Sequence, residues 1–214
     1  MYVLDREAFR TVDTNRIKQF VECWERFYRG SARLPNSPEL IDYFRELNLS
    51  HDLSEQNATR LLRWKDPRML THSKQDSDRG AAPNPRVERA LIKLDRINEF
   101  RSGALSQDDF AKVTHEVFPN GIIWQLFLFH MAQPWQWPIA DQHVFRAHAL
   151  LFNSPAPNTI GSFRGYAAQF HTMAKRFRED LYVDEKDLNA IVHANKRLDN
   201  ALMAYGQFLQ AYDR

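Results

Sequence analysis

The chain has 214 residues, of which 43% are hydrophobic and 26% are charged, and its formal net charge at pH 7 is +2. This length suffices for one domain or two small lobes with a buried core, and the composition is typical of a soluble globular protein. The longest apolar run, Ile122 to Ala132, is interrupted by Gln125 and His130 and is shorter than the ~20 residues that cross a bilayer. We therefore expect no membrane partner.

The amino-terminal sequence and the cysteine content narrow the class further. The stretch MYVLDREAFRTVD lacks the apolar core and the cleavage site of a secretory signal, so we expect a cytoplasmic protein. Because Cys23 is the single cysteine, an internal disulfide, a four-thiolate zinc site and a conventional iron–sulfur cluster are excluded. The neighbours of Cys23 in the sequence are mostly apolar, and we predict a packed thiol rather than a reactive one.

Helix signals recur along the whole chain, and no segment alternates with period two between hairpin turns, so we predict an all-α fold. Ser106 and Asp109 resemble a capping box, and proline at the first helical position follows Ser37 and Asn84. The expected helices, in chain order, run from a cap at Asp13 or Thr14 to Gly30, from Ser37 to Leu47, from Ser54 onward, from Asn84 to Gly103, from Ser106 to Val117, from Ile122 to Met131, from Gln142 to Phe152, from Thr159 to Arg178 and from Asp184 to Tyr212.

The domain organisation has two interpretations. We interpret residues 1–214 as a single helical unit, and the alternative is a two-lobe arrangement in which residues 1–66 join 150–214 and residues 84–149 form the other lobe. Residues 67–85 are rich in turn-forming residues and poor in apolar ones, so we expect a surface loop there.

Basic residues are concentrated in two stretches. From Arg60 to Arg101 there are eleven Lys or Arg and six Asp or Glu, and from Phe163 to Arg178 there are four basic residues and no acidic one. Such stretches attract phosphate groups if folding places them on one face, and a solvated basic face is the alternative.

The segment from residue 118 to residue 148, FPNGIIWQLFLFHMAQPWQWPIADQHVFRAH, holds three of the five tryptophans. Residues 119–121, Pro-Asn-Gly, predict a tight turn between two helices. A second bend at residues 134–138 then places Asp141 at the start of the next helix. The segment therefore predicts a helix-hairpin-helix-like element that is followed by a helix with a leading aspartate.

Residues 141–147, DQHVFRA, resemble the D-T-H-V-F-R-V stretch of the helix-hairpin-helix DNA glycosylases, the superfamily of endonuclease III and 3-methyladenine DNA glycosylase II. Residues 118–122, FPNGI, stand where this family has its L-P-G-V-G hairpin, at a similar distance from the aspartate. The resemblance implies that Asp141 is the catalytic carboxylate and that the hairpin amides bind a DNA phosphate. DNA is therefore the expected partner.

The sequence departs from the family pattern in two ways. Only Gly121 stands where the family has two glycines, so Asn120 is expected to supply the other unusual backbone conformation. Members that also cut the strand carry a lysine shortly after the hairpin, whereas no lysine occurs between Lys112 and Lys175. A tryptophan, Trp124, lies near that position, and in this feature the sequence resembles the 3-methyladenine enzyme, which acts without lysine. The resemblance thus implies base release without strand cleavage.

The chemistry of base release indicates a role for each candidate residue. Breaking an N-glycosidic bond develops positive charge on the sugar, which a fixed anion such as Asp141 stabilises. The target base must leave the stack, and aromatic walls then stack against it. The candidate base-pocket residues are Trp124, Trp135, Trp137, Phe145 and His143. The candidate contacts to the DNA backbone are Pro119, Asn120, Gly121, Ile122, Arg146, Arg63 and Lys65.

Each candidate has an alternative interpretation. Asp141 is also a favoured N-cap residue, Trp124 keeps the spacing of a core residue, and Arg146 is placed to form a salt bridge. Histidines near Asp141 invite a metal proposal, but His143 and His148 follow it by two and seven residues, so one helix face does not hold all three. We therefore predict no metal and no other cofactor.

Two other functions remain open. The first is a non-catalytic helical DNA-binding protein on the same scaffold. The second is a helical protein-interaction module, in which an apolar patch stays exposed along residues 188–209 of the last helix.

Overall fold

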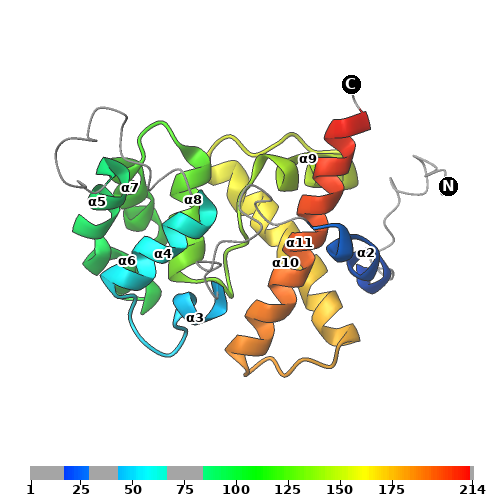
Figure 1. The fold of residues 1–214 in the computed structure, drawn as a ribbon, viewed down its shortest axis with the longest axis horizontal. Coiled ribbons are helices and arrows are strands. Elements are labelled where there is room, and N and C mark those ends of the chain that lie inside the picture. Colours follow the sequence, from blue (N-terminus) through cyan, green and yellow to red (C-terminus); the bar gives the residue numbers. More distant parts are fainter. Residues whose placement is uncertain (1–16, 29–42, 67–83, 213–214) are drawn as a thin grey trace, which may run out of the picture. The chain divides into compact units, whose positions relative to one another are not determined.

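The computed structural model describes residues 17–28, 43–66 and 84–212. In these three ranges the chain is helical and has no strand, which confirms the predicted all-α class (Figure 1). The expected helix start at Asp13 or Thr14, the start at Ser37 and nearly all of the expected surface loop lie outside the described residues.

The described helices follow the predicted ones closely. They are α2 (Ile17–Trp24), the 3-10 turn η2 (Glu25–Phe27), α3 (Tyr43–Leu47), α4 (Glu55–Lys65), α5 (Pro85–Ile92), α6 (Leu94–Arg101), α7 (Gln107–Val117), α8 (Ile122–Ala132), α9 (Gln142–Phe152), α10 (Ile160–Asp180) and α11 (Leu188–Tyr212).

The helix ends show why the sequence signals were informative. The side chains of Ser54, Ser106 and Thr159 each accept a hydrogen bond from the backbone N–H three residues later, as N-caps do. One expected helix is instead two, because Lys93 leaves the helical conformation between α5 and α6. The Nζ atom of Lys93 lies 2.6 Å from Oε2 of Glu116, so the break coincides with a contact to α7.

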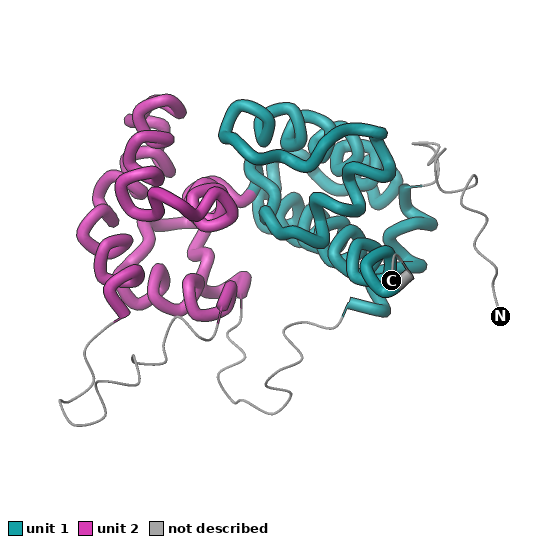
Figure 2. The backbone as a smooth tube through the Cα atoms, turned by 90° about the horizontal axis from the view of Figure 1, so that it is seen from above, with its two compact units in different colours: residues 1–33, 135–214 teal, residues 34–134 magenta. Residues whose placement is uncertain are grey.

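The chain divides into two compact units (Figure 2). Unit 1 comprises residues 1–33 and 135–214, and unit 2 comprises residues 34–134. This division differs from the lobes considered above, since α3 and α4 group with α5 to α8, and α9 groups with the carboxy-terminal helices. The packing accounts for the difference: α4 lies against α3 and α5, whereas α9 lies against α11.

Unit 1 is built around α11, which packs against α9, α2, η2 and α10. The two longest helices, α10 and α11, lie side by side in it (Figure 1). The apolar stripe of α11 is buried in this packing, with Ile191, Val192, Leu198, Leu202 and Tyr205 all below 9% exposed. The apolar surface that a protein-interaction module would present along this helix is therefore inside unit 1.

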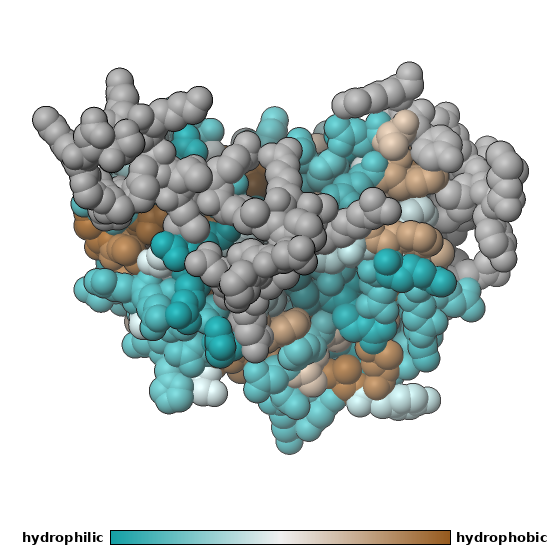
Figure 3. Space-filling view, viewed as in Figure 1, coloured by the Kyte–Doolittle hydropathy of each residue, from teal (hydrophilic) through white to brown (hydrophobic). Residues whose placement is uncertain are grey.

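The large hydrophobic side chains that are exposed in the described ranges are Phe27, Ile92, Tyr182 and Leu188. They lie on different elements. On the face drawn in Figure 3, hydrophobic residues of the described part correspondingly form separate patches among hydrophilic ones.

Unit 2 surrounds α8, whose residues 125–132 are all buried. The buried guanidinium of Arg101, at the end of α6, joins two other helix ends of this unit. Its Nη2 atom donates to the carbonyl oxygens of Leu47 (2.7 Å) and Asn48 (2.6 Å), and its Nη1 atom donates to those of Met131 (3.1 Å) and Ala132 (3.3 Å). These carbonyls at the ends of α3 and α8 are of the kind that a helix cannot satisfy internally. Arg101 therefore has a structural role.

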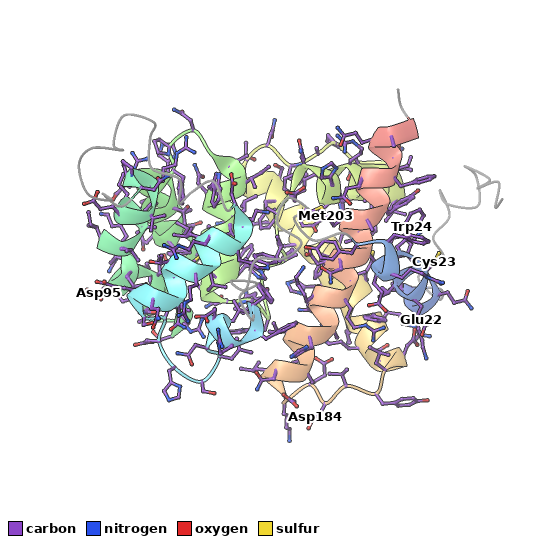
Figure 4. All side chains as sticks on the ribbon, in the orientation of Figure 1. Glu22, Cys23, Trp24, Asp95, Asp184 and Met203 are labelled. Atoms are coloured by element: carbon purple, nitrogen blue, oxygen red, sulfur yellow. The ribbon has the colours of Figure 1, made fainter. Side chains whose placement is uncertain are left out.

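Cys23 is exposed on α2, so the prediction of a packed thiol was wrong (Figure 4). The buried positions of this helix are Ile17, Phe20, Val21 and Trp24. They form one stripe at spacings of three and four residues, and Cys23 falls outside it. The apolar neighbours in the sequence thus face the core while the thiol faces outward.

Candidate functional site

Asp141 begins α9 and caps it. Its backbone is extended (φ −153°, ψ 153°), and its Oδ1 atom accepts a hydrogen bond of 2.9 Å from the backbone N–H of His143. The side chain is half-buried. The positive end of the helix dipole favours an anion at this position. Asp141 is therefore an N-cap, as one interpretation predicted, and it is also an anion that the fold holds in place.

The start of α9 lies directly against the backbone of α11. At Gly206 of α11, a Cβ atom would lie only 1.8 Å from the carbonyl oxygen of His143. No residue other than glycine fits there without a shift of one helix, because the obstructing atom belongs to the backbone. Gly206 is not among the predicted site residues. A glycine inside an otherwise regular helical pattern is the signal that points to such a contact.

Arg146 stabilises the same contact between α9 and α11. Its Nη1 atom donates to Nδ1 of His143 (3.0 Å) and to the carbonyl oxygen of Gly206 (3.3 Å). Burial lowers the pKa of His143, although the charge of Asp141 opposes this effect. A ring nitrogen that accepts from a guanidinium belongs to a neutral imidazole. Arg146 thus links His143, at the start of α9, to the backbone of α11.

Three further polar residues of unit 1, outside the predicted site residues, interact with one another or with the charge of Asp141. Burial, with the negative charges of Asp199 and Asp141, raises the pKa of Tyr28 to about 12. Lys196 lies 3.2 Å from the Oδ2 atom of the buried Asp199 and 5.0 Å from the centre of the Tyr28 ring. Tyr166 responds to the same two carboxylates, which raise the pKa of its hydroxyl after the larger effect of burial. The charge of Asp141 thus acts on the hydroxyls of both Tyr28 and Tyr166.

Two of the predicted base-pocket aromatics belong to the core of unit 1. Trp137 is 5% exposed and stacks on Phe163, with ring centres 5.9 Å apart. Phe145 is 4% exposed and meets Tyr166 edge to face at 5.5 Å. Trp135 is half-buried, and its carbonyl oxygen accepts from the side chain of Asn195. This aromatic cluster supports the segment that leads to Asp141, and contact of its members with a base stays a prediction.

The predicted hairpin lies in unit 2, between α7 and α8. The backbone N–H of Gly121 donates to the carbonyl oxygen of Phe118 (3.2 Å), which closes the turn. Asn120 does not adopt a positive φ, and Gly121 has a φ of −126°, so the expected unusual conformation at Asn120 was wrong. The turn therefore closes without a left-handed residue.

The surroundings of the turn are open. Pro119 and Asn120 are exposed, and Gly121 and Ile122 are half-buried. A Cβ atom at Gly121 would meet its nearest neighbour, Trp124, at 3.4 Å, which is ordinary contact. Trp124 itself is half-buried against Phe118, at 5.5 Å between ring centres. The fold of unit 2 therefore tolerates a side chain at this glycine.

The basic stretches are partly neutralised by folding. In unit 1, Arg178 is buried and pairs with Glu185 (2.8 Å), and Arg176 pairs with Glu179 (3.4 Å). In unit 2, Arg60 pairs with Glu46. The candidate contacts Arg63 and Lys65 lie in the last turn of α4, where both are half-buried, and the Lys65 ammonium is 5.7 Å from the centre of the Phe127 ring.

The predicted site residues thus fall into two groups. Asp141, His143, Phe145, Arg146, Trp135 and Trp137 belong to unit 1; Arg63, Lys65, Pro119, Asn120, Gly121, Ile122 and Trp124 belong to unit 2. Within unit 1, four of these residues lie in the first turns of α9 or at its cap, whereas Trp137 stacks on Phe163 of α10 and the Trp135 carbonyl accepts from Asn195 of α11. Among the described residues, no three His, Cys, Asp or Glu side chains are grouped as metal ligands would be. None of the described helices combines the length and hydrophobicity that a bilayer crossing requires.

Comparisons of the chain with known protein families, with curated proteins and with solved structures gave no match.

Proposed function

We propose that this protein is a monofunctional DNA N-glycosylase, which binds DNA, accepts a flipped base and hydrolyses its N-glycosidic bond with Asp141. The observation that carries the proposal is the placement of Asp141. It is a half-buried carboxylate that caps α9, at the head of the stretch that resembles the D-T-H-V-F-R-V of helix-hairpin-helix DNA glycosylases. No lysine-dependent strand cleavage is proposed.

A fixed anion supports this reaction in a simple way. When the bond between C1′ and the base nitrogen breaks, its electron pair leaves with the base and the sugar becomes positively charged. A carboxylate already held in place stabilises that charge without reorganisation. The N–H of His143, the close approach of α11 at Gly206 and the contacts of Arg146 all fix Asp141 in this way.

The turn in unit 2 supports the DNA-binding part of the proposal. The helix α8 starts at Gly121 without a side-chain cap, whereas α4, α7, α9 and α10 each have one. Uncapped amides at a helix N-terminus favour a phosphate. The exposed Pro119 and Asn120 leave this end accessible, and main-chain amides would then make the contact that the family makes with two glycines.

The test compares Asp141→Asn with Asp141→Ala. Asparagine retains the capping hydrogen bond but removes the charge, and alanine removes both. Duplexes that carry alkylated, deaminated or oxidised bases are incubated with each variant, and abasic sites are revealed by alkaline cleavage. We expect Asp141→Asn to lower base release by about 10²-fold or more while the melting temperature and DNA affinity are kept.

Asp95→Asn is the matched control, because Asp95 is exposed on α6 of unit 2 (Figure 4). This variant should release base at the wild-type rate. Equal activity of wild type and Asp141→Asn on a base that the wild type removes contradicts the catalytic role.

One observation favours the second candidate, a non-catalytic DNA-binding protein on this scaffold. Trp137 and Phe145 are buried in the core of unit 1, so their faces are occupied by protein atoms. This candidate predicts salt-dependent duplex binding, no abasic sites in any of the duplexes, and no effect of Asp141→Asn on binding. The same experiment therefore separates the two functions.

A further inference from the structure

The half-buried guanidinium of Arg146 on α9 is held in place through its Nη1 atom alone. Nη1 donates to Nδ1 of His143 (3.0 Å) and to the carbonyl oxygen of Gly206 (3.3 Å). Within the described part of the chain, Nε and Nη2 form no hydrogen bond, yet neither is buried. These two nitrogens form an open edge that faces solvent, on a side chain whose orientation is already fixed.

The charge of Arg146 is not neutralised by an ion pair with any described residue, because both of its acceptors are neutral. Two other arginines of unit 1 show the contrast. Arg178 pairs with Glu185 at 2.8 Å. Arg197 pairs with Glu25 at 2.7 Å. The Nε–H and Nη2–H groups of a guanidinium donate two parallel hydrogen bonds, which match the oxygens of a phosphate. The open edge of Arg146 therefore has the charge and the geometry to bind a phosphate.

Asp141 and Arg146 are bonded to the same residue. Oδ1 of Asp141 accepts from the backbone N–H of His143 at 2.9 Å, and Arg146 donates to the His143 ring. The proposed function brings the sugar of the flipped nucleotide to Asp141, and every sugar within a DNA strand is flanked by phosphates. A phosphate of the DNA backbone is therefore the anion that the proposed function brings to this part of α9.

The ring of His143 holds Arg146 only while the ring is neutral, because a protonated imidazole accepts no hydrogen bond. The ionisable groups that act on this ring are Asp141 and Arg146 of α9, and α11, which packs against it, contributes the carbonyl of Gly206. That carbonyl favours the protonated ring, and Arg146 already donates to it. Protonation thus removes one acceptor of Arg146, competes for the other and adds a like charge beside the guanidinium.

We propose that the open edge of Arg146 binds one phosphate of the DNA backbone, and that protonation of His143 switches this contact off. The proposal rests on the DNA-binding part of the proposed function and does not require base release. Burial lowers the pKa of His143 from 6.5, although the charge of Asp141 opposes this effect. The contact is therefore present at pH 7.5 and is lost as the pH falls through the lowered value. Arg146 is the contact residue, and His143 is a positioning residue because it acts through the guanidinium.

The first experiment measures what Arg146 contributes to DNA affinity at two pH values. Fluorescence anisotropy gives the Kd of a labelled duplex for the wild type and for Arg146→Gln, at fixed salt and at a temperature where both proteins are folded. We expect the substitution to increase Kd by about tenfold at pH 7.5 and by less than about twofold at pH 5. No effect at pH 7.5 overturns the contact, and the same factor at both pH values overturns the switch.

Two further variants test the charge and the histidine separately. Arg164→Gln removes the same charge from an exposed position of α10 in unit 1, and it should increase Kd by less than about twofold at both pH values. His143→Asn keeps an acceptor oxygen near the place of Nδ1 and does not titrate. In this background Arg146→Gln should increase Kd by about tenfold at pH 5 as well as at pH 7.5. A factor that still disappears at pH 5 contradicts the role of His143.

Nuclear magnetic resonance of the histidine rings in the wild type needs no variant. A duplex that binds best when His143 is neutral must, by linkage, lower the pKa of His143. The exposed His115 and His193 are internal references, because a nearby polyanion favours the protonated ring and raises a histidine pKa. We expect the pKa of His143 to fall when the duplex is added. A rise equal to that of the two references overturns the switch.

The outcomes separate this proposal from the proposed function. If the wild type binds DNA with this pH pattern but releases no base, the phosphate contact stands and the glycosylase function fails. If the wild type releases base while Arg146→Gln binds the duplex as tightly as the wild type at pH 7.5, the function stands and the phosphate contact fails.

Discussion

Arg101 in unit 2 and Gly206 in unit 1 both determine how helices meet, but they do so in opposite ways. Each fixes a place where separate helices meet. Arg101 does so by filling the space between the ends of α3 and α8 with a long cation that donates to four carbonyl oxygens. Gly206 does so by leaving space empty of side-chain atoms, so that the backbone of α11 touches the start of α9.

The difference shows what fixes the position of Asp141, the candidate carboxylate. The carboxyl ends of helices are negative, and a cation matches them. The start of α9 carries Asp141, and there the fold relies chiefly on the shape of the α9–α11 crossing. The position of Asp141 therefore depends on packing precision in unit 1, and changes of side-chain volume should affect it more than changes of charge at a distance.

Replacement of Arg101 by methionine should have the largest effect on stability. Three buried carbonyl oxygens, those of Leu47, Met131 and Ala132, lose this donor, whereas the Asn48 oxygen keeps the N–H of His51. Each unsatisfied group costs about 1–3 kcal/mol, so we expect the free energy of unfolding of unit 2 to fall by about 3 kcal/mol or more. Chemical denaturation measures the loss. Arg89→Met, at an exposed position of α5, should change it by less than about 0.5 kcal/mol. A loss for Arg101→Met as small as that of this control would show that water replaces the guanidinium.

Gly206→Ala should come next. The added methyl group meets the backbone of His143, and overpacking of this kind costs about 1–3 kcal/mol. Gly165→Ala on α10 is a control with the opposite sign, because nothing lies within 4 Å of the new Cβ and alanine favours a helix by about 0.5–1 kcal/mol. Base release should fall in Gly206→Ala and not in Gly165→Ala. Equal stability of the two variants would contradict the close crossing.

Acidification should weaken unit 1. Burial lowers the pKa of His143, His148 and His171, so the folded state keeps these imidazoles neutral where the unfolded chain already binds protons. Their contribution to stability is present above the unfolded pKa of 6.5 and is lost as the pH falls through the lower folded values. Amide hydrogen exchange in α9 and α10 at pH 7.5 and pH 5, corrected for intrinsic rates, measures the effect. Protection that rises toward pH 5 would contradict the expected sign.

Gly121→Ala should have the smallest effect on stability. Its Cβ has room in unit 2, so we expect the free energy of unfolding to change by less than about 0.5 kcal/mol. If the amides at the start of α8 bind a phosphate, the methyl group stands in the way, and the Kd for duplex DNA should increase by about tenfold. Fluorescence anisotropy at fixed salt measures this affinity. An unchanged Kd would remove the hairpin from the proposed DNA contact.

The helices were predictable because their signals are local. Ser106 accepts from the N–H of Asp109 as the capping box predicted, and the stripe of Ile17, Phe20, Val21 and Trp24 is buried as a unit. The same periodicity leaves Cys23 outside this stripe and therefore predicts it on the outer face. The mistake came from treating apolar neighbours in the sequence as neighbours in space.

The candidate site was predictable only in part, because contacts between helices leave no local signal in the sequence. Asp141 at the start of a helix follows from its residue type and from the bend before it. The crossing at Gly206, the carbonyl contacts of Arg101 and the buried hydroxyl of Tyr166 depend on which helices meet, and no spacing in the sequence reports that. The angle at Asn120 was wrong because the turn closes through the carbonyl of Phe118 without a left-handed residue.

The outward position of Cys23 gives the protein a built-in attachment point. The chain has one thiol, and it stands on the exposed side of α2 in unit 1. A maleimide dye would therefore modify each molecule once, with no engineered residue. The opposite side of this helix packs on α11. The fluorescence of the dye would therefore change when α2 and α11 loosen. It would report the effect of Gly206→Ala on this packing without any substrate.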